Sequence, residues 1–152
     1  MGYTHYFTQT RDLTDGEFAE VREIMDKVIA GSNVPVGDWS GDPINERKAT
    51  FWRDEGVGFN GLDDDAHETF CIPQKREVKD YQSDDFKGFL FCKTARKSYD
   101  TLVVACLCRI EQRMPGAFRI DSDGGPDEWE MGLELARRIF DDPTIRVPEA
   151  VE

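Results

Sequence analysis

The chain has 152 residues, and its 31 Asp and Glu outnumber its 19 Lys and Arg to give a formal net charge of −12. This length fits one domain that buries about 70% of its unfolded surface and needs no disulfide or metal to build a core. Hydrophobic residues at 39% and aromatic residues at 11% argue against a disordered chain, and the acidic balance argues against non-specific binding to duplex nucleic acid.

The first expected elements are a strand and a helix. Residues 2–8 are aromatic and β-branched, which predicts a strand with Tyr3 and His5 on one face and Tyr6 on the other. A capping-box pattern followed by apolar residues at helical spacing then predicts a helix over 14–31.

The middle of the chain is expected to be loops and short strands. Residues 31–47 are rich in turn formers and predict a long loop, in which we expect Trp39 to pack over a pocket or a core edge. Three strands follow, over 49–53, 57–60 and 67–72. The first two form a hairpin through the turn 54–56, and Pro73 ends the third. The polar residues 74–85 indicate a solvated connection.

The last part of the chain predicts two more strands and two more helices. Residues 88–94 hold a continuous apolar run, which favours a buried central strand. The helix over 99–113, for which Ser98 and Asp100 give the start signal, is apolar almost all round and should be largely buried. Two further elements are a strand over 117–120 and a helix over 126–140, and residues 143–152 are expected to be a loose tail.

The order β-α-β-β-β-β-α-β-α favours an α+β fold over residues 1–142, with a mixed or antiparallel sheet of about six strands and three helices mainly on one face. No apolar stretch reaches the roughly 18 residues of a membrane span, and the polar start is unlike a signal peptide, so we expect a cytoplasmic protein without membrane contact. The four cysteines lack CxxC spacing and are expected to be buried thiols: Cys71, Cys92, Cys106 and Cys108.

Linear signatures of catalysis and metal binding are missing. The two histidines, His5 and His67, are far apart, and the acidic run at 121–124 lacks the glycine and glutamate of a calcium loop. Neither a nucleophile elbow nor a phosphate-binding glycine loop occurs. We therefore assign no catalytic residue, no metal and no cofactor.

The segment 93–99 is the least expected local feature of so acidic a chain. It places Lys93, Arg96 and hydroxyl side chains between a strand and a helix, where helix N–H groups favour an anion. The alternative is that these cations simply pair with surface acids.

Polar aromatic residues in the strands suggest a shared polar cavity, because buried polar groups need partners. Rings that stack on a base, together with cations and hydroxyls, match a small anionic ligand of nucleotide type. The competing interpretation is an internal hydrogen-bond network. The expected ligand-binding residues are Tyr3, His5, Tyr6, Asn60, Glu68, Lys93, Thr94, Arg96 and Tyr99.

Four motifs stand out together: Met-Gly-Tyr-Thr-His-Tyr at 1–6, Phe-Asn-Gly at 59–61, His-Glu-Thr-Phe at 67–70 and Phe-Cys-Lys-Thr-Ala-Arg-Lys at 91–97. With them the chain resembles a family of small uncharacterised proteins of bacteriophages, actinobacteria and other bacteria, which typically open Met-Gly-Tyr-Thr-His-Tyr-Trp. Phe7 stands where that family has Trp, and Ser98 where it more commonly has Pro. The resemblance implies no established reaction.

Three hypotheses for function follow. The resemblance to phage proteins and the expected pocket favour a protein that sequesters a nucleotide-derived host immune signal, of cyclic dinucleotide or ADP-ribose type, without turnover in the host cytoplasm. An alternative is an enzyme acting on a nucleotide or phosphorylated metabolite, with His5 or His67 as general acid or base, oriented by Glu68. A second alternative is an acidic protein-interaction module that mimics nucleic acid. Pairing of the apolar helix over 99–113 in a homodimer is left open.

Overall fold

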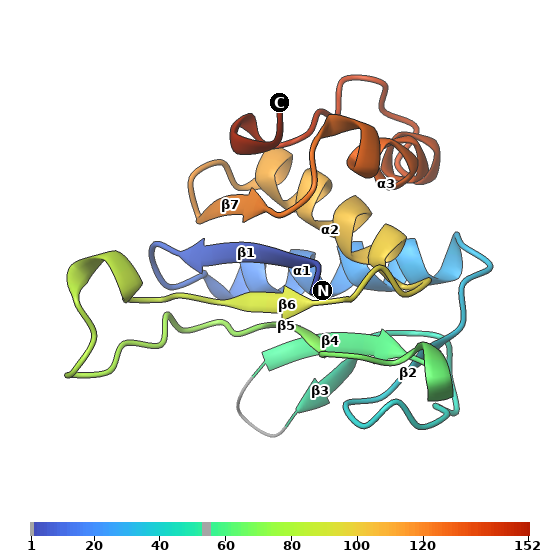
Figure 1. Ribbon diagram of the computed structural model, residues 1–152, viewed down its shortest axis with the longest axis horizontal. Helices are drawn as coiled ribbons and strands as arrows, with labels where there is room; N and C mark the ends of the chain where they lie inside the picture. Colours follow the sequence, from blue (N-terminus) through green and yellow to red (C-terminus); the bar gives the residue numbers. More distant parts are fainter. Residues whose placement is uncertain (1, 53–55) are drawn as a thin grey trace.

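The computed structural model describes residues 2–52 and 56–152 (Figure 1). These residues form three α-helices, seven strands and three short 3₁₀ helices. The α-helices are α1 (Asp15–Ala30), α2 (Asp100–Arg113) and α3 (Pro126–Ile139). The strands are β1 (Thr4–Gln9), β2 (Val36–Gly37), β3 (Thr50–Trp52), β4 (Gly56–Gly61), β5 (Phe70–Ile72), β6 (Phe91–Lys93) and β7 (Phe118–Ser122).

The strands form two small antiparallel sheets. One sheet has the order β6-β1-β7, and in the other β4 pairs with β2, β3 and β5. In Figure 1 the first sheet lies above the second, with α1 behind it and α2 and α3 towards the top. The α+β class with antiparallel strands is confirmed, and the strands are divided between two sheets of three and four.

β1 is the central strand of its sheet, because it bonds to β6 on one side and to β7 on the other. The strand predicted at the start of the chain is present, but burial along β1 does not alternate. His5 and Phe7 are buried, Tyr6 on the opposite face is half-buried, and Thr4 and Thr8 on that same face are buried as well. The prediction of a central strand over 88–94 is wrong. β6 pairs with β1 alone, and Phe91 is 52% exposed, because the apolar run gives no signal of how many neighbours the strand has.

The helices form where the sequence predicts them. Thr14 and Glu17 make the reciprocal capping box that begins α1, with the Glu17 N–H donating to the Thr14 hydroxyl at 3.1 Å. In α2 every residue from Leu102 to Cys108 is buried, which confirms the expectation of a helix that is apolar all round. The N-cap of α2 is Tyr99, without a side-chain cap, so the expected role of Ser98 at that helix start is wrong.

Several short elements differ from the expectations. The loop over 31–47 contains β2, which pairs with β4, and the strand expected over 67–72 is only β5. β3 and β4 pair as the expected hairpin, whereas residues 53–55 at its turn lie outside the described residues.

The C-terminal segment is packed against the fold, so the prediction of a loose tail is wrong. Ile145 has no exposed surface and Val151 only 2%. The Arg137 Nε donates to the Ile145 carbonyl at 2.8 Å and fixes the segment to α3. Spaced apolar residues in a short non-helical segment leave no periodic pattern, which is why the sequence analysis missed this packing. No helix among the described residues is both long and apolar enough to cross a membrane.

Candidate functional site

Several of the expected ligand-binding residues meet around one buried histidine. His5 is the second residue of β1 and lies opposite Ser122 of β7, and its ring has no exposed surface. The His5 Nδ1 lies 2.8 Å from the Ser122 Oγ, and the Nε2 lies 2.6 Å from an Asp100 carboxylate oxygen at the start of α2. The Thr94 hydroxyl donates to that same oxygen at 2.6 Å. The histidine therefore links both edges of the sheet to α2.

The hydrogen bonds at Ser122 determine where the protons lie. Its Oγ accepts from the Gly124 N–H at 3.0 Å and from the Trp129 Nε1–H at 3.1 Å. A hydroxyl has two lone pairs and one hydrogen, so that hydrogen is donated to the His5 Nδ1. In this arrangement the His5 Nδ1 accepts from Ser122, and its Nε2–H is donated to Asp100. We call these connected residues the His5 network: His5, Thr94, Asp100, Ser122 and Trp129.

Aromatic and cationic side chains close the His5 network from outside. The rings of Tyr3 and Trp129 contact the His5 ring edge-on at centroid distances of 5.1 and 5.2 Å. The Arg96 guanidinium lies 4.2 Å above the Tyr3 ring and forms an ion pair with Glu128. Burial, and then the charges of Asp100 and Glu128, raise the pKa of Tyr3 to about 12.

The backbone turns sharply to bring Arg96 over Tyr3. Ala95 and Arg96 both have left-handed φ values, of 52° and 60°, a conformation that non-glycine residues seldom adopt. The structure thus brings Tyr3, His5, Thr94 and Arg96 together, as the sequence analysis expected. They are packed on one another, with the Arg96 charge compensated by Glu128, in the manner of the internal network left open as the alternative to a pocket.

Glu68, Lys93 and Tyr99, also expected to bind a ligand, join the two sheets. The Glu68 N–H donates to the Lys93 carbonyl at 3.1 Å, and the Lys93 N–H donates to a Glu68 carboxylate oxygen at 2.7 Å. The Tyr99 hydroxyl donates to the Glu68 carbonyl, and burial raises the pKa of Tyr99. These polar atoms have partners that hold β6 against the segment before β5.

Asn60 has an indirect connection to a cavity. Its amide nitrogen donates to the Thr69 Oγ1 at 3.2 Å, and its carbonyl oxygen accepts from the N–H groups of Gly61 and His67. The Thr69 hydroxyl donates in turn to the Trp39 carbonyl at 3.0 Å. The Trp39 indole packs on Trp52 with ring centroids 4.7 Å apart. Asn60 therefore positions Trp39 through Thr69.

We call the hollow beside this indole the Trp39 cavity. It has a volume of about 510 Å³, within the range of about 300–1,000 Å³ usual for small-ligand sites. Its walls come from β5 and its flanks, from the segment after β5, and from the start of β6. The lining residues are Trp39, Thr69, Cys71, Pro73, Lys75, Arg76, Glu77, Leu90 and Phe91. The expectation that Trp39 packs over a pocket is confirmed.

The rim of the Trp39 cavity carries two cations, Lys75 and Arg76, that form no ion pair with a described residue. Lys75 is exposed and forms no ion pair with a described residue. Arg76 donates through Nε to the Gln9 carbonyl at 2.9 Å and through Nη2 to the Lys87 carbonyl at 3.1 Å. Its guanidinium forms no ion pair with a described residue, although its charge contributes, after that of Lys87, to lowering the pKa of Asp84, and its backbone N–H donates to an Asp12 carboxylate oxygen at 2.7 Å. Among the described lining residues Glu77 is the one acid, and Lys79 lies 4.0 Å from it. Lys75 is therefore the lining cation that could gain a partner from a bound anion.

A row of rings leads from the cavity over the open face of the β6-β1-β7 sheet. Tyr6 and Phe91 are cross-strand neighbours, and Phe89 lies beside both. The Phe89 ring is 5.6 Å from that of Phe91 and stacks on Tyr6 at 6.1 Å with an interplanar angle of 30°. We call Tyr6, Phe89 and Phe91 the aromatic row. Of these three rings only Tyr6 is among the expected ligand-binding residues, because the apolar run that contains Phe89 and Phe91 predicts a buried strand.

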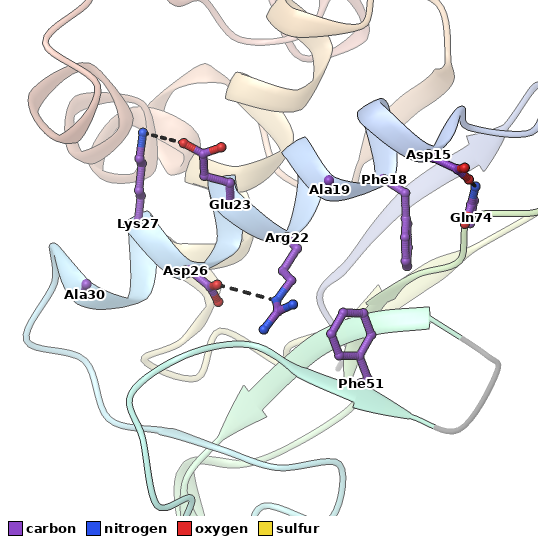
Figure 2. A pocket seen from close by; sticks show the side chains of 10 residues that line it. All are labelled: Asp15, Phe18, Ala19, Arg22, Glu23, Asp26, Lys27, Ala30, Phe51 and Gln74. Carbon is purple, nitrogen blue, oxygen red and sulfur yellow. Dashed lines mark hydrogen bonds and ion pairs between the residues drawn. The ribbon is translucent and has the colours of Figure 1, made fainter.

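A larger hollow of about 580 Å³ lies between α1 and β3. Figure 2 shows the rings of Phe18 and Phe51 facing this groove, with the Arg22 guanidinium 4.7 Å above the Phe51 ring. The two cations among its described lining residues are paired with acids on α1: Lys27 with Glu23 at 2.8 Å and Arg22 with Asp26 at 3.7 Å. The groove therefore lacks, among those residues, a cation without an ion pair, and we take the Trp39 cavity as the candidate site.

The cysteines differ in their surroundings. All four are thiols and not disulfides, and Cys71 is half-buried where it lines the Trp39 cavity. Cys92, Cys106 and Cys108 are buried, and burial raises the pKa of all three thiols, that of Cys108 to about 12. Burial is thus confirmed for three of the four. Over residues 2–52 and 56–152, no cluster of three or more His, Cys, Asp or Glu is arranged to hold a metal ion.

The chain matches no known family model, no curated protein and no solved structure. The resemblance to the phage and bacterial family therefore stays a prediction.

Proposed function

We propose that the protein binds a small nucleotide-type ligand, with a flat ring and an anionic group, in the Trp39 cavity and releases it unchanged. The observation that carries this proposal is the combination, at one cavity, of ring walls with cations that form no ion pair with a described residue. Trp39 and Phe91 supply surfaces on which a base stacks, and Lys75 and Arg76 supply charge for a phosphate. Sequestration of a host immune signal is one form of this function and stays a prediction.

The proton arrangement of the His5 network supports binding without turnover. The order Ser122, His5, Asp100 has the donor sequence of a catalytic triad, with the two ring nitrogens exchanged. A nucleophilic hydroxyl needs a lone pair directed at the substrate. Both lone pairs of Ser122 are engaged by the N–H groups of Gly124 and Trp129. We therefore interpret this network as structural.

Calorimetric titration with AMP and ADP-ribose, together with the variants Lys75→Ala and Phe91→Ala, tests the proposal. Each variant should weaken binding by about tenfold, since a base–ring stack or a charge-assisted hydrogen bond contributes on the order of 1–3 kcal/mol. Lys27→Ala is the matched control, because it removes the same charge from a distant exposed site on α1. Binding that Lys75→Ala and Phe91→Ala leave unchanged, or no binding at 1 mM (roughly the weakest affinity of interest), would refute the proposed site.

Two further measurements bear on the same site. Bound ligand should slow the alkylation of Cys71, which is the most accessible thiol and lines the cavity. Mass spectrometry of the ligand recovered after denaturation should show it intact. Recovery of a cleaved product would favour the enzyme alternative.

A further inference from the structure

We propose that the ligand of the Trp39 cavity carries two flat rings joined by an anionic linker, as in a dinucleotide, with one ring in the cavity and the other on the aromatic row. This inference rests on the proposed function and specifies its ligand class. Phe91 makes the connection, because it lines the cavity and is also the first ring of the row. A ligand seated in the cavity is therefore adjacent to a second stacking surface.

The aromatic row is partly exposed: Phe91 is exposed, while Tyr6 and Phe89 are half-buried and the exposed ring of Phe86 packs edge-on against Phe89 at 6.0 Å. Phe91 is 52% exposed and Tyr6 is half-buried on the sheet face opposite the buried His5 and Phe7. Single exposed apolar residues are ordinary, whereas neighbouring exposed rings on one face indicate an interaction site. Ring faces of this kind stack bases on open sheets in several nucleotide-binding folds.

The far ring of the row is held in place before any ligand arrives. The Tyr6 hydroxyl donates to one Asp123 carboxylate oxygen at 3.2 Å, and the Thr4 N–H donates to the other at 3.0 Å. The Tyr6 ring also stacks on Phe89. A ring fixed in this way loses little conformational freedom when a base stacks on it, which favours affinity.

Charge along the face gives the ligand a direction. Lys75 and Arg76 lie at the cavity, and Lys93, two residues after Phe91 on β6, forms no ion pair with a described residue. Beyond Tyr6 the charge is mixed, since its cross-strand partner on β7 is Asp121, and the exposed Arg119 lies two residues away on the same face. The anionic linker is therefore favoured on the β6 side. The second base is favoured over Tyr6, where a carboxylate can accept from an exocyclic amino group.

The test compares AMP with linear and cyclic diadenosine ligands at one salt concentration by calorimetry. Both two-ring ligands should bind at least tenfold more tightly than AMP. Phe89→Ala should weaken the two-ring ligands by about tenfold, as expected for the loss of a base–ring stack, and leave AMP unchanged. Lys75→Ala should weaken all three.

Phe51→Ala is the matched control, because Phe51 is 50% exposed against 52% for Phe91 and lies on β3, outside the cavity and the row. Tyr6→Phe keeps the ring and should bind two-ring ligands far better than Tyr6→Ala. Equal affinities for AMP and the two-ring ligands, both weakened by Lys75→Ala, would overturn this inference and leave the proposed function intact. Failure of every ligand to bind would overturn both.

Discussion

Replacing Ser122 by alanine is the sharpest test of the proton assignment at His5. The substitution removes one oxygen that accepts two hydrogen bonds and donates a third. The Trp129 Nε1–H and the His5 Nδ1 would then be left without partners inside the protein, since both side chains have no exposed surface. The Gly124 N–H would lose its acceptor as well.

The magnitude follows from those two buried groups. Leaving a buried donor or acceptor unpaired costs roughly 1–3 kcal/mol, so Ser122→Ala should lower the free energy of unfolding by about 2–5 kcal/mol. Domains are stable by only about 5–15 kcal/mol, so the loss should be plain in urea unfolding. It corresponds to a fall in Tm of roughly 5–15 °C for a chain of this size.

Ser98→Ala is the control for Ser122→Ala. Ser98 is exposed, and its hydroxyl makes one long hydrogen bond of 3.3 Å to Asp65. Its replacement should change stability by less than about 0.5 kcal/mol. A loss below about 1 kcal/mol for Ser122→Ala would refute the buried network, judged by the cost of unpaired groups. Nitrogen NMR should find the His5 proton on Nε2, with exposed His67 as reference, and a proton on Nδ1 would refute the assigned tautomer.

Two other predictions concern the ends of the chain. Hydrogen bonds from Arg11 and from the Thr14 N–H lower the pKa of Glu17 from 4.5 to about 2, so its stabilisation is complete above pH 4.5 and is lost as the pH falls towards 2. Urea unfolding should therefore separate Glu17→Gln from the parent protein at pH 7 and progressively less below pH 4.5, and a constant separation would contradict this cause. Ile145→Ala should lower the free energy of unfolding by about 2–5 kcal/mol, since that side chain is fully buried. The exposed neighbour Arg146→Ala should have little effect, and equal small effects would indicate a tail that is loose after all.

The sequence predicted those features that depend on neighbours in the chain. Alternation along residues 2–8 placed His5 and Tyr6 on opposite faces, and the Thr14 capping box gave the start of α1. The meeting of Tyr3, His5 and Arg96 also followed, because buried polar rings and a cationic turn both require partners. The identity of those partners did not follow. Ser122 lies 117 residues from His5, and no local pattern relates the two.

The Trp39 cavity could also be predicted only in part from the sequence. Trp39 was expected near a pocket because a large aromatic residue in a polar loop needs a surface to pack on. Lys75 and Arg76 were assigned to a solvated connection, since polar residues without periodicity carry no signal of what lies across from them. Arg76 is in fact fixed by the carbonyls of Gln9 and Lys87, which the sequence places far apart.

The His5 network and the Trp39 cavity differ in which of their groups are available to bind a ligand. In the His5 network the atoms bonded to His5 and Ser122 already have partners, so a ligand that bonds to these atoms must break hydrogen bonds of similar strength. The adjoining Tyr3 hydroxyl has no hydrogen-bond partner among the described residues, but it is buried. At the Trp39 cavity the Lys75 ammonium has no counter-ion among the described residues, and the Phe91 ring is half exposed. Binding energy comes from groups that gain a partner on binding. A ligand therefore gains more binding free energy at the Trp39 cavity and the aromatic row than at His5.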